Sequence, residues 1–157
     1  MQSFSTCLWF DNQAESAAQF YVGLFQNSRI LEVKHNLDGG PMPAGTVLTV
    51  LFSLNGSEYL ALNGGPQYQH SPAMSLMVYC DTQDEVDTLW QGLCEGGQPI
   101  QCGWVTDKFG VSWQVVPRVF MTLLDSADKA ASQRAMTAMM GMVKLDIAAL
   151  LKAYTGA

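Results

Sequence analysis

The chain contains an internal repeat, in which residues 8–25 are matched by residues 78–94. Three polar residues recur at one constant spacing: Asp11, Gln13 and Glu15 in the first copy, and Asp81, Gln83 and Glu85 in the second. After a deletion of one residue, a large apolar pair and a Gly-Leu pair follow in both copies. Chance can produce part of this match, but its constant order favours duplication. A duplicated segment restricts the chain to a fold of two similar halves.

Each copy predicts a strand followed by a helix. The alternating apolar runs Thr6–Phe10 and Ser75–Cys80 are typical of strands. The repeated Asp ends each run, and Asn12 or Thr82 is the candidate N-cap of a helix with an apolar stripe. Further strands are expected at residues 29–35, 46–54 and 58–62 in the first half, and at residues 99–104 and 111–116 in the second. The sequence therefore predicts an α+β fold of two tandem βαβββ modules.

These modules have predicted bounds of about residues 1–66 and 73–120, and a helical tail follows over about residues 125–155. The tail is expected to form two helices, or one helix kinked near Gly141, with an N-cap at Asp125-Ser126. Because this tail is amphipathic and rich in Met, it predicts core or dimer packing. We expect a homodimer that uses residues 119–124 and the helices after Asp125.

Charge and composition exclude several classes of protein. Lys and Arg number 8 against 14 Asp and Glu, which leaves a net charge of −6 and no basic stripe for nucleic acid or for an anionic membrane. No apolar run approaches the ~20 residues of a membrane span, and the first residues do not read as a signal peptide. We therefore expect a cytoplasmic protein, in which the 4 cysteines are free thiols.

Several motifs along the chain resemble those of a known family. They are Leu8-Trp9-Phe10-Asp11, Ala17 to Tyr21, Phe25-Gln26-Asn27-Ser28-Arg29-Ile30, Ala61-Leu62-Asn63-Gly64-Gly65-Pro66, Cys102-Gly103-Trp104, and Asp107 to Arg118. With the tandem modules, they resemble the PhnB-type branch of the vicinal oxygen chelate superfamily, a branch labelled 3-demethylubiquinone 3-methyltransferase. The superfamily includes glyoxalase I, bleomycin-resistance proteins and extradiol dioxygenases. The resemblance covers almost the whole chain and implies a single domain over residues 1–157, in which both modules form one cup-shaped mixed sheet.

In this superfamily, four strand positions inside the cup hold a divalent metal. The resemblance assigns those positions to Ser5, Ala61, Ser75 and Gln114. Alanine offers no donor atom, and neutral hydroxyl and amide groups are weak ligands for transition metals. We therefore expect no bound metal. We also expect no S-adenosylmethionine, because the Gly64-Gly65 turn leads into a loop and presents no helix N-terminus.

Strand alternation indicates what the cup binds instead. It places Ser5 and Trp9 on one face of a strand, and the same rule groups other polar and aromatic side chains. The candidate ligand-binding residues are Ser5, Trp9, Tyr59, Asn63, Ser75, Tyr79 and Gln114. They favour a metal-free protein that binds an aromatic or cationic organic molecule. A cup filled by its own side chains is the competing interpretation.

An enzyme of the same superfamily is the alternative function. It would be a metal-dependent isomerase, lyase or dioxygenase, or a methyltransferase as the family label suggests. None of the predicted cup positions holds a His, Asp or Glu to act as a base beside Ser5 or Ser75. The sequence therefore identifies no catalytic residue and leans against an enzyme.

Overall fold

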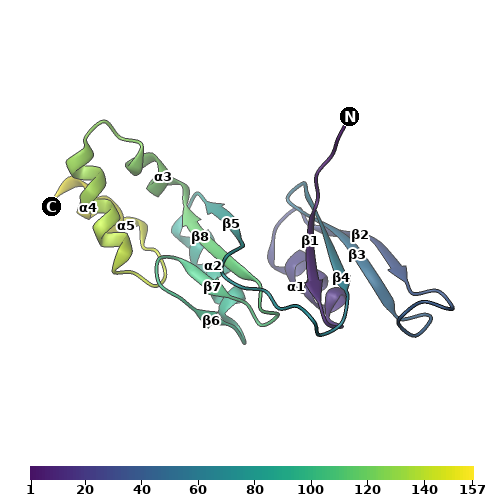
Figure 1. Ribbon diagram of the computed structural model, residues 1–157. Coiled ribbons are helices and arrows are strands. Elements are labelled where there is room, and N and C mark those ends of the chain that lie inside the picture. The colour runs from purple at the N-terminus through teal and green to yellow at the C-terminus, as the bar shows by residue number, and fades with distance from the viewer. The chain divides into compact units, whose positions relative to one another are not determined.

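The computed structural model describes residues 1–157, which form two compact units, Met1–His70 and Ser71–Ala157. Each unit holds one four-stranded mixed sheet, and helices complete both (Figure 1). The predicted α+β class with two similar modules and C-terminal helices is confirmed. None of the helices combines the length and the apolar character that crossing a membrane requires.

The first unit follows the predicted β-α-β-β-β order. Its elements are β1 (Thr6–Phe10), α1 (Ala14–Leu24), β2 (Arg29–His35), β3 (Val47–Leu54) and β4 (Ser57–Asn63). The strand order is β1-β4-β3-β2, with β1 parallel to β4 and the remaining pairs antiparallel. The predicted hairpin turn Asn55-Gly56 joins β3 to β4, and both of its residues have positive φ. Each strand of this unit agrees with its predicted bounds to within one residue.

The second unit repeats this plan with shorter outer strands. Its sheet elements are β5 (Ser75–Cys80), α2 (Gln83–Cys94), β6 (Gln98–Pro99), β7 (Trp104–Thr106) and β8 (Ser112–Pro117), in the strand order β5-β8-β7-β6. The prediction of one strand over residues 99–104 is wrong, because the chain turns between β6 and β7. Cys102 and Gly103 adopt left-handed φ values of 62° and 79°, which interrupt an extended strand.

The repeated helices begin differently in the two units. Thr82 is the N-cap of α2, as the sequence predicts, and it forms a capping box with Glu85. The prediction of Asn12 as the other N-cap is wrong, since α1 starts at Ala14 and Gln13 takes the cap position. The backbone N–H of Ala14 instead donates to the side-chain oxygen of Asn63, at the end of β4. A residue distant in sequence therefore satisfies this helix end.

One face of each sheet packs against the helix of its own unit. In the first unit the fully buried side chains of β3 and β4 include Val50, Phe52 and Ala61, and α1 covers them with Tyr21. In the second unit Val105 and Val115 lie under α2. Burying these side chains supplies the main stabilisation of each unit. The other face of each sheet has no helix of the repeated module over it.

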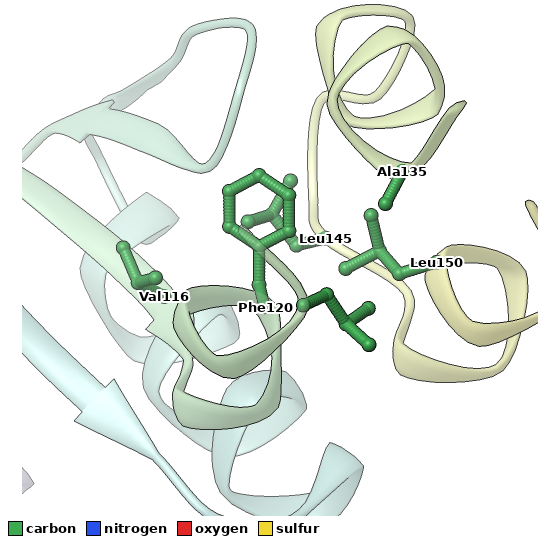
Figure 2. Close-up of a cluster of buried hydrophobic side chains, with 6 residues drawn as sticks. Val116, Phe120, Ala135, Leu145 and Leu150 are labelled. Atoms are coloured by element: carbon green, nitrogen blue, oxygen red, sulfur yellow. The ribbon is translucent and has the colours of Figure 1, made fainter. Parts of the chain in front are cut away.

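The C-terminal helices are α3 (Arg118–Leu124), α4 (Lys129–Met140) and α5 (Ile147–Thr155). The predicted break near Gly141 is confirmed and gives two helices, but the predicted N-cap at Asp125-Ser126 is wrong. The N-cap of α4 is Asp128, whose side chain accepts a hydrogen bond from the backbone of Ala131. Figure 2 shows the apolar cluster that joins these helices to the end of β8, formed by Val116, Phe120, Leu123, Ala135, Leu145 and Leu150.

Candidate ligand-binding site

The face of the second sheet that α2 does not cover carries the largest group of predicted site residues. In the parallel pair β5–β8, Ser75 lies beside Ser112, Met77 beside Gln114, and Tyr79 beside Val116. These are all on one face, because side chains alternate along each strand. Trp104 of β7 pairs with Gln114 and joins the same face. This set is called the open face below, and it contains three predicted residues: Ser75, Tyr79 and Gln114.

Ser75 and Gln114 are brought into direct contact. The Gln114 side-chain amide donates a hydrogen bond of 2.9 Å to the Ser75 hydroxyl oxygen. Because the Ser75 oxygen accepts this bond, the hydroxyl proton of Ser75 remains available to donate to another group. The pair therefore presents a hydroxyl donor and an amide carbonyl acceptor at neighbouring strand positions.

Ser112 of the open face, which is not among the predicted residues, has the most unusual environment. Its side chain is 1% exposed, and its hydroxyl has no hydrogen-bond partner. An unpaired buried hydroxyl costs roughly 1–3 kcal/mol, so most proteins avoid one. Its neighbours across the two ladders are Ser75 and Thr106, which makes this end of the open face polar. Burial is what distinguishes Ser112 from the other polar residues of the open face, and strand alternation does not predict it.

Tyr79 lies at the other end of the open face and is 42% exposed. The Arg118 guanidinium lies 5.4 Å from the centre of its ring, and Arg118 also donates to Asp81 at 2.9 Å. One side of the Tyr79 ring therefore already has a cation from this chain. A cationic ligand would meet like charge there, which weakens the prediction that Tyr79 stacks a cation.

Trp9 supports a turn in the first unit. Its indole N–H donates to the backbone oxygen of Gly65 at 2.9 Å, and the Tyr68 ring meets the indole edge-on at 5.0 Å. The Nε2 atom of His70 lies 2.6 Å from the Trp9 carbonyl oxygen. The polar atom of the indole is thus used within the chain, and Trp9 fixes the segment after β4.

The predicted grouping of Tyr59 and Asn63 with Trp9 is wrong. Trp9 pairs with Leu62, so Tyr59 and Asn63 lie on the opposite face, which α1 covers. The Tyr59 ring stacks on buried Phe52, with centroids 5.5 Å apart. Asn63 caps α1 and also donates to the Val47 carbonyl oxygen at 3.0 Å. Both side chains have structural partners on the helix-covered face.

Ser5 is exposed and immediately precedes β1. The four positions that the superfamily uses for a metal hold two hydroxyls, one amide and one methyl group, and no imidazole, carboxylate or thiolate. Ala61 is fully buried with no donor, and Ser75 and Gln114 bond to each other. No cluster of three or more His, Cys, Asp or Glu side chains able to hold a metal occurs in the chain. These residues do not fit a divalent transition metal.

The turn after β4 does not fit S-adenosylmethionine either. A β-carbon on Gly64 would lie 2.3 Å from the Trp9 ring, so the indole occupies the space that a small glycine leaves. No helix begins after Gly65, and the next element is β5. The turn therefore lacks the helix N-terminus that would hold a charged cofactor group.

The comparisons with known proteins agree with this architecture. Residues 2–116 match the model of the family described as 3-demethylubiquinone-9 3-methyltransferase. The chain belongs to this family. Its predicted place in the PhnB-type branch is confirmed. A Bacillus cereus PhnB protein, named for the same methyltransferase, is 35% identical with a TM-score of 0.68, and the match covers 74% of this chain and 99% of that chain.

More distant members of the fold lie at lower identity. Protein PA1353 from Pseudomonas aeruginosa is 19% identical with a TM-score of 0.63, and the match covers 74% of this chain and 98% of that chain. Protein SA1046 from S. aureus is 20% identical with a TM-score of 0.51, over 74% and 97% of the two chains. Both likenesses concern the fold alone. No curated protein matches the sequence.

Proposed function

We propose that this protein binds a small neutral aromatic molecule on the open face of its second module, without a metal. The observation that supports this most is the buried, unpaired hydroxyl of Ser112 beside the Ser75–Gln114 pair. A ligand oxygen that displaces the side chains over Ser112 and accepts from its hydroxyl would remove the cost of leaving it unpaired. The proposal keeps Ser75, Tyr79 and Gln114 as ligand-binding residues and adds Ser112 and Trp104.

The chemistry of the open face defines the class of ligand. Its side chains are neutral: Ser75, Met77, Tyr79, Trp104, Thr106, Ser112, Gln114 and Val116. Hydroxyl donors and an amide carbonyl suit a ligand that carries a carbonyl or hydroxyl group. Trp104 lies beside Gln114 and offers a ring for stacking. A neutral aromatic amide, ketone or phenol meets these conditions, and a permanent cation does not.

Ligand titration with a Ser112 variant tests the proposal. Neutral aromatic amides and phenols, with aromatic quaternary ammonium compounds as the cationic set, are titrated against intrinsic Trp fluorescence. Saturable binding of a neutral compound is expected, and Ser112→Ala should weaken it about 2- to 10-fold, the equivalent of one hydrogen bond. The variant should unfold no more easily than the wild type, since the lost hydroxyl has no partner.

Ser57→Ala is the matched control, because Ser57 is exposed at the start of β4 in the other unit. It should leave the affinity unchanged. The absence of saturable binding by every neutral compound overturns the proposed function. Equal affinities of the wild type and Ser112→Ala would remove Ser112 from the site.

An enzyme is the second candidate, and the family description is the observation that favours it. Calorimetry with S-adenosylmethionine tests a methyltransferase, and metal analysis of untagged protein tests a metal-dependent reaction. Micromolar binding in the first measurement, or stoichiometric metal in the second, would favour the enzyme over the binding protein.

We also propose that the protein is a cytoplasmic homodimer that pairs through its C-terminal helices. Phe120 and Leu123 of the predicted interface are buried within the chain, which leaves the exposed Met121, Met140 and Leu151 for contact. Light scattering gives the mass in solution. A dimeric wild type and a monomeric Leu151→Lys variant are expected, and a monomeric wild type would refute the pairing.

A further inference from the structure

The C-terminal helices are an addition to the fold of the family. The family match ends at residue 116, just before α3 begins at Arg118. Almost the whole Bacillus cereus relative, 99% of its chain, aligns with only 74% of this one. The two modules are therefore complete without residues 118–157, and the role of α3–α5 has to be sought in what they contact.

Polar contacts fix the linker between α4 and α5 to the second module. The Gln83 side chain, in the first turn of α2, donates to the Leu145 carbonyl at 3.1 Å and accepts from the Ile147 N–H at 2.8 Å. The backbone N–H groups of Cys102 and Gly103 donate to the carbonyls of Met142 and Val143, both at 2.8 Å. These bonds hold the linker at the end of the sheet where β7 begins and β8 ends.

The apolar cluster of the added helices includes a residue of the open face. Val116 is two residues beyond Gln114 on β8, about 7 Å along the strand. Phe120 and Leu145 belong to the cluster that buries Val116 (Figure 2). A β-carbon on Gly103, next to Trp104, would lie 3.1 Å from Leu145. The polar part of the open face thus ends at this apolar cluster. The distance from Gln114 to the cluster along β8 is about the length of one aromatic ring.

We propose that α3–α5 form an end wall of the open face, and that Phe120 sets the length of the ligand that fits there. This inference rests on the proposed function. It assigns a ligand of one aromatic ring whose polar group bonds near Gln114 and Ser112 and whose far end meets the wall. A ring with a longer substituent would collide with the cluster around Val116.

A series of benzamides with para substituents of increasing length tests the wall. The wild type should bind benzamide and lose affinity steadily from methyl to propyl. Phe120→Leu shortens the side chain while keeping it apolar, and it should raise the affinity for the propyl compound by about 3- to 10-fold relative to benzamide, as expected for one or two buried methylene groups. A variant that only loses stability would bind all of the benzamides less well and would not change the order of their affinities.

Leu123→Ala is the matched control, because Leu123 belongs to the same cluster but lies one turn further along α3, where its carbonyl accepts from Ser132 of α4. It should lower stability and leave the order of ligands unchanged. If the wild type binds benzamides and Phe120→Leu keeps the wild-type order, the wall is overturned and the proposed function stands. If no benzamide or other neutral aromatic binds the wild type, both are overturned.

Discussion

The indole ring of Trp9 lies directly against Gly64, so that a β-carbon on Gly64 would come within 2.3 Å of the ring. The same indole donates its N–H to the carbonyl of Gly65. The backbone of this turn is bonded to β1 as well, because Gly64 N–H donates to the Phe10 carbonyl at 2.9 Å. The absence of a side chain at Gly64 therefore allows the backbone after β4 to pack directly against the Trp9 ring.

Gly64→Ala should destabilise the protein by about 1–3 kcal/mol, because the added methyl group requires the ring or the turn to move. Urea denaturation followed by circular dichroism measures the change. Gly23→Ala is the matched control, since nothing lies within 4 Å of its added β-carbon and it is exposed in α1. That variant should gain about 0.5–1 kcal/mol. Equal stability of Gly64→Ala and the wild type would show that Trp9 moves aside freely.

The sequence predicts the module order and most strands because short-range patterns determine them. Alternation within β5 and within β8 predicts which residues of each strand share a face, and the observed register brings Ser75 and Gln114 together on one of them. Alternation within β1 and β4 was equally clear, but it does not give the register between the two strands. A shift of one residue reverses the face, and Trp9 pairs with Leu62. The prediction that groups Tyr59 and Asn63 with Trp9 is wrong for this reason.

Other parts of the candidate site depend on tertiary contacts that no local pattern shows. Ser112 stands out only because its neighbours bury it and leave its hydroxyl unpaired. Cys102 has a left-handed φ, an uncommon conformation for a residue with a side chain, and no sequence pattern indicates the turn that it forms before Trp104. The attachment of the tail by Gln83 joins residues far apart in sequence, and helical periodicity carries no signal of it.

Asn63→Ala should lower stability by about 2 kcal/mol and leave ligand affinity unchanged, because Asn63 holds the start of α1 and the Val47 carbonyl. Asn12→Ala is the control, since Asn12 is exposed and does not cap the helix. Thermal unfolding and the benzamide titration are measured on the same samples. If Asn63→Ala loses ligand affinity but keeps the stability of the wild type, Asn63 belongs to the binding site.

Cys80 should resist alkylation in the folded protein at pH 8. Burial, and then the carboxylates of Glu85 and Asp81, raise the pKa of its thiol to about 11, so the reactive thiolate is scarce. Iodoacetamide labelling followed by peptide mass spectrometry should modify Cys80 only after denaturation. Because folding favours the protonated thiol, its contribution to stability is lost as the pH rises from about 9 to about 11. Cys80→Ala should make that decline shallower, and rapid labelling of native Cys80 would contradict the prediction.

The ion pair between Lys144 and Asp87, 2.6 Å apart, should make the attachment of the C-terminal helices depend on pH. The hydrogen bond from Lys144, followed by the one from Gln83, lowers the pKa of the Asp87 carboxyl below its ordinary value. A lowered pKa means that the folded state favours the carboxylate, so the stabilisation is fully present at neutral pH. It is lost as the pH falls below about 4 and through the folded-state pKa. Asp87→Asn should therefore lower the melting temperature slightly at pH 7 and not at pH 2.

Lys144→Met provides the matched test of this pair. It should show the same pH profile as Asp87→Asn, and the double variant should be no less stable than either single variant if the two side chains act only through each other. Both side chains are partly exposed, so the effect should stay within a few degrees and shrink at high salt. A loss of melting temperature that persists undiminished at pH 2 would show that Asp87 acts through packing. Additive losses in the double variant would show that the two residues stabilise the linker independently.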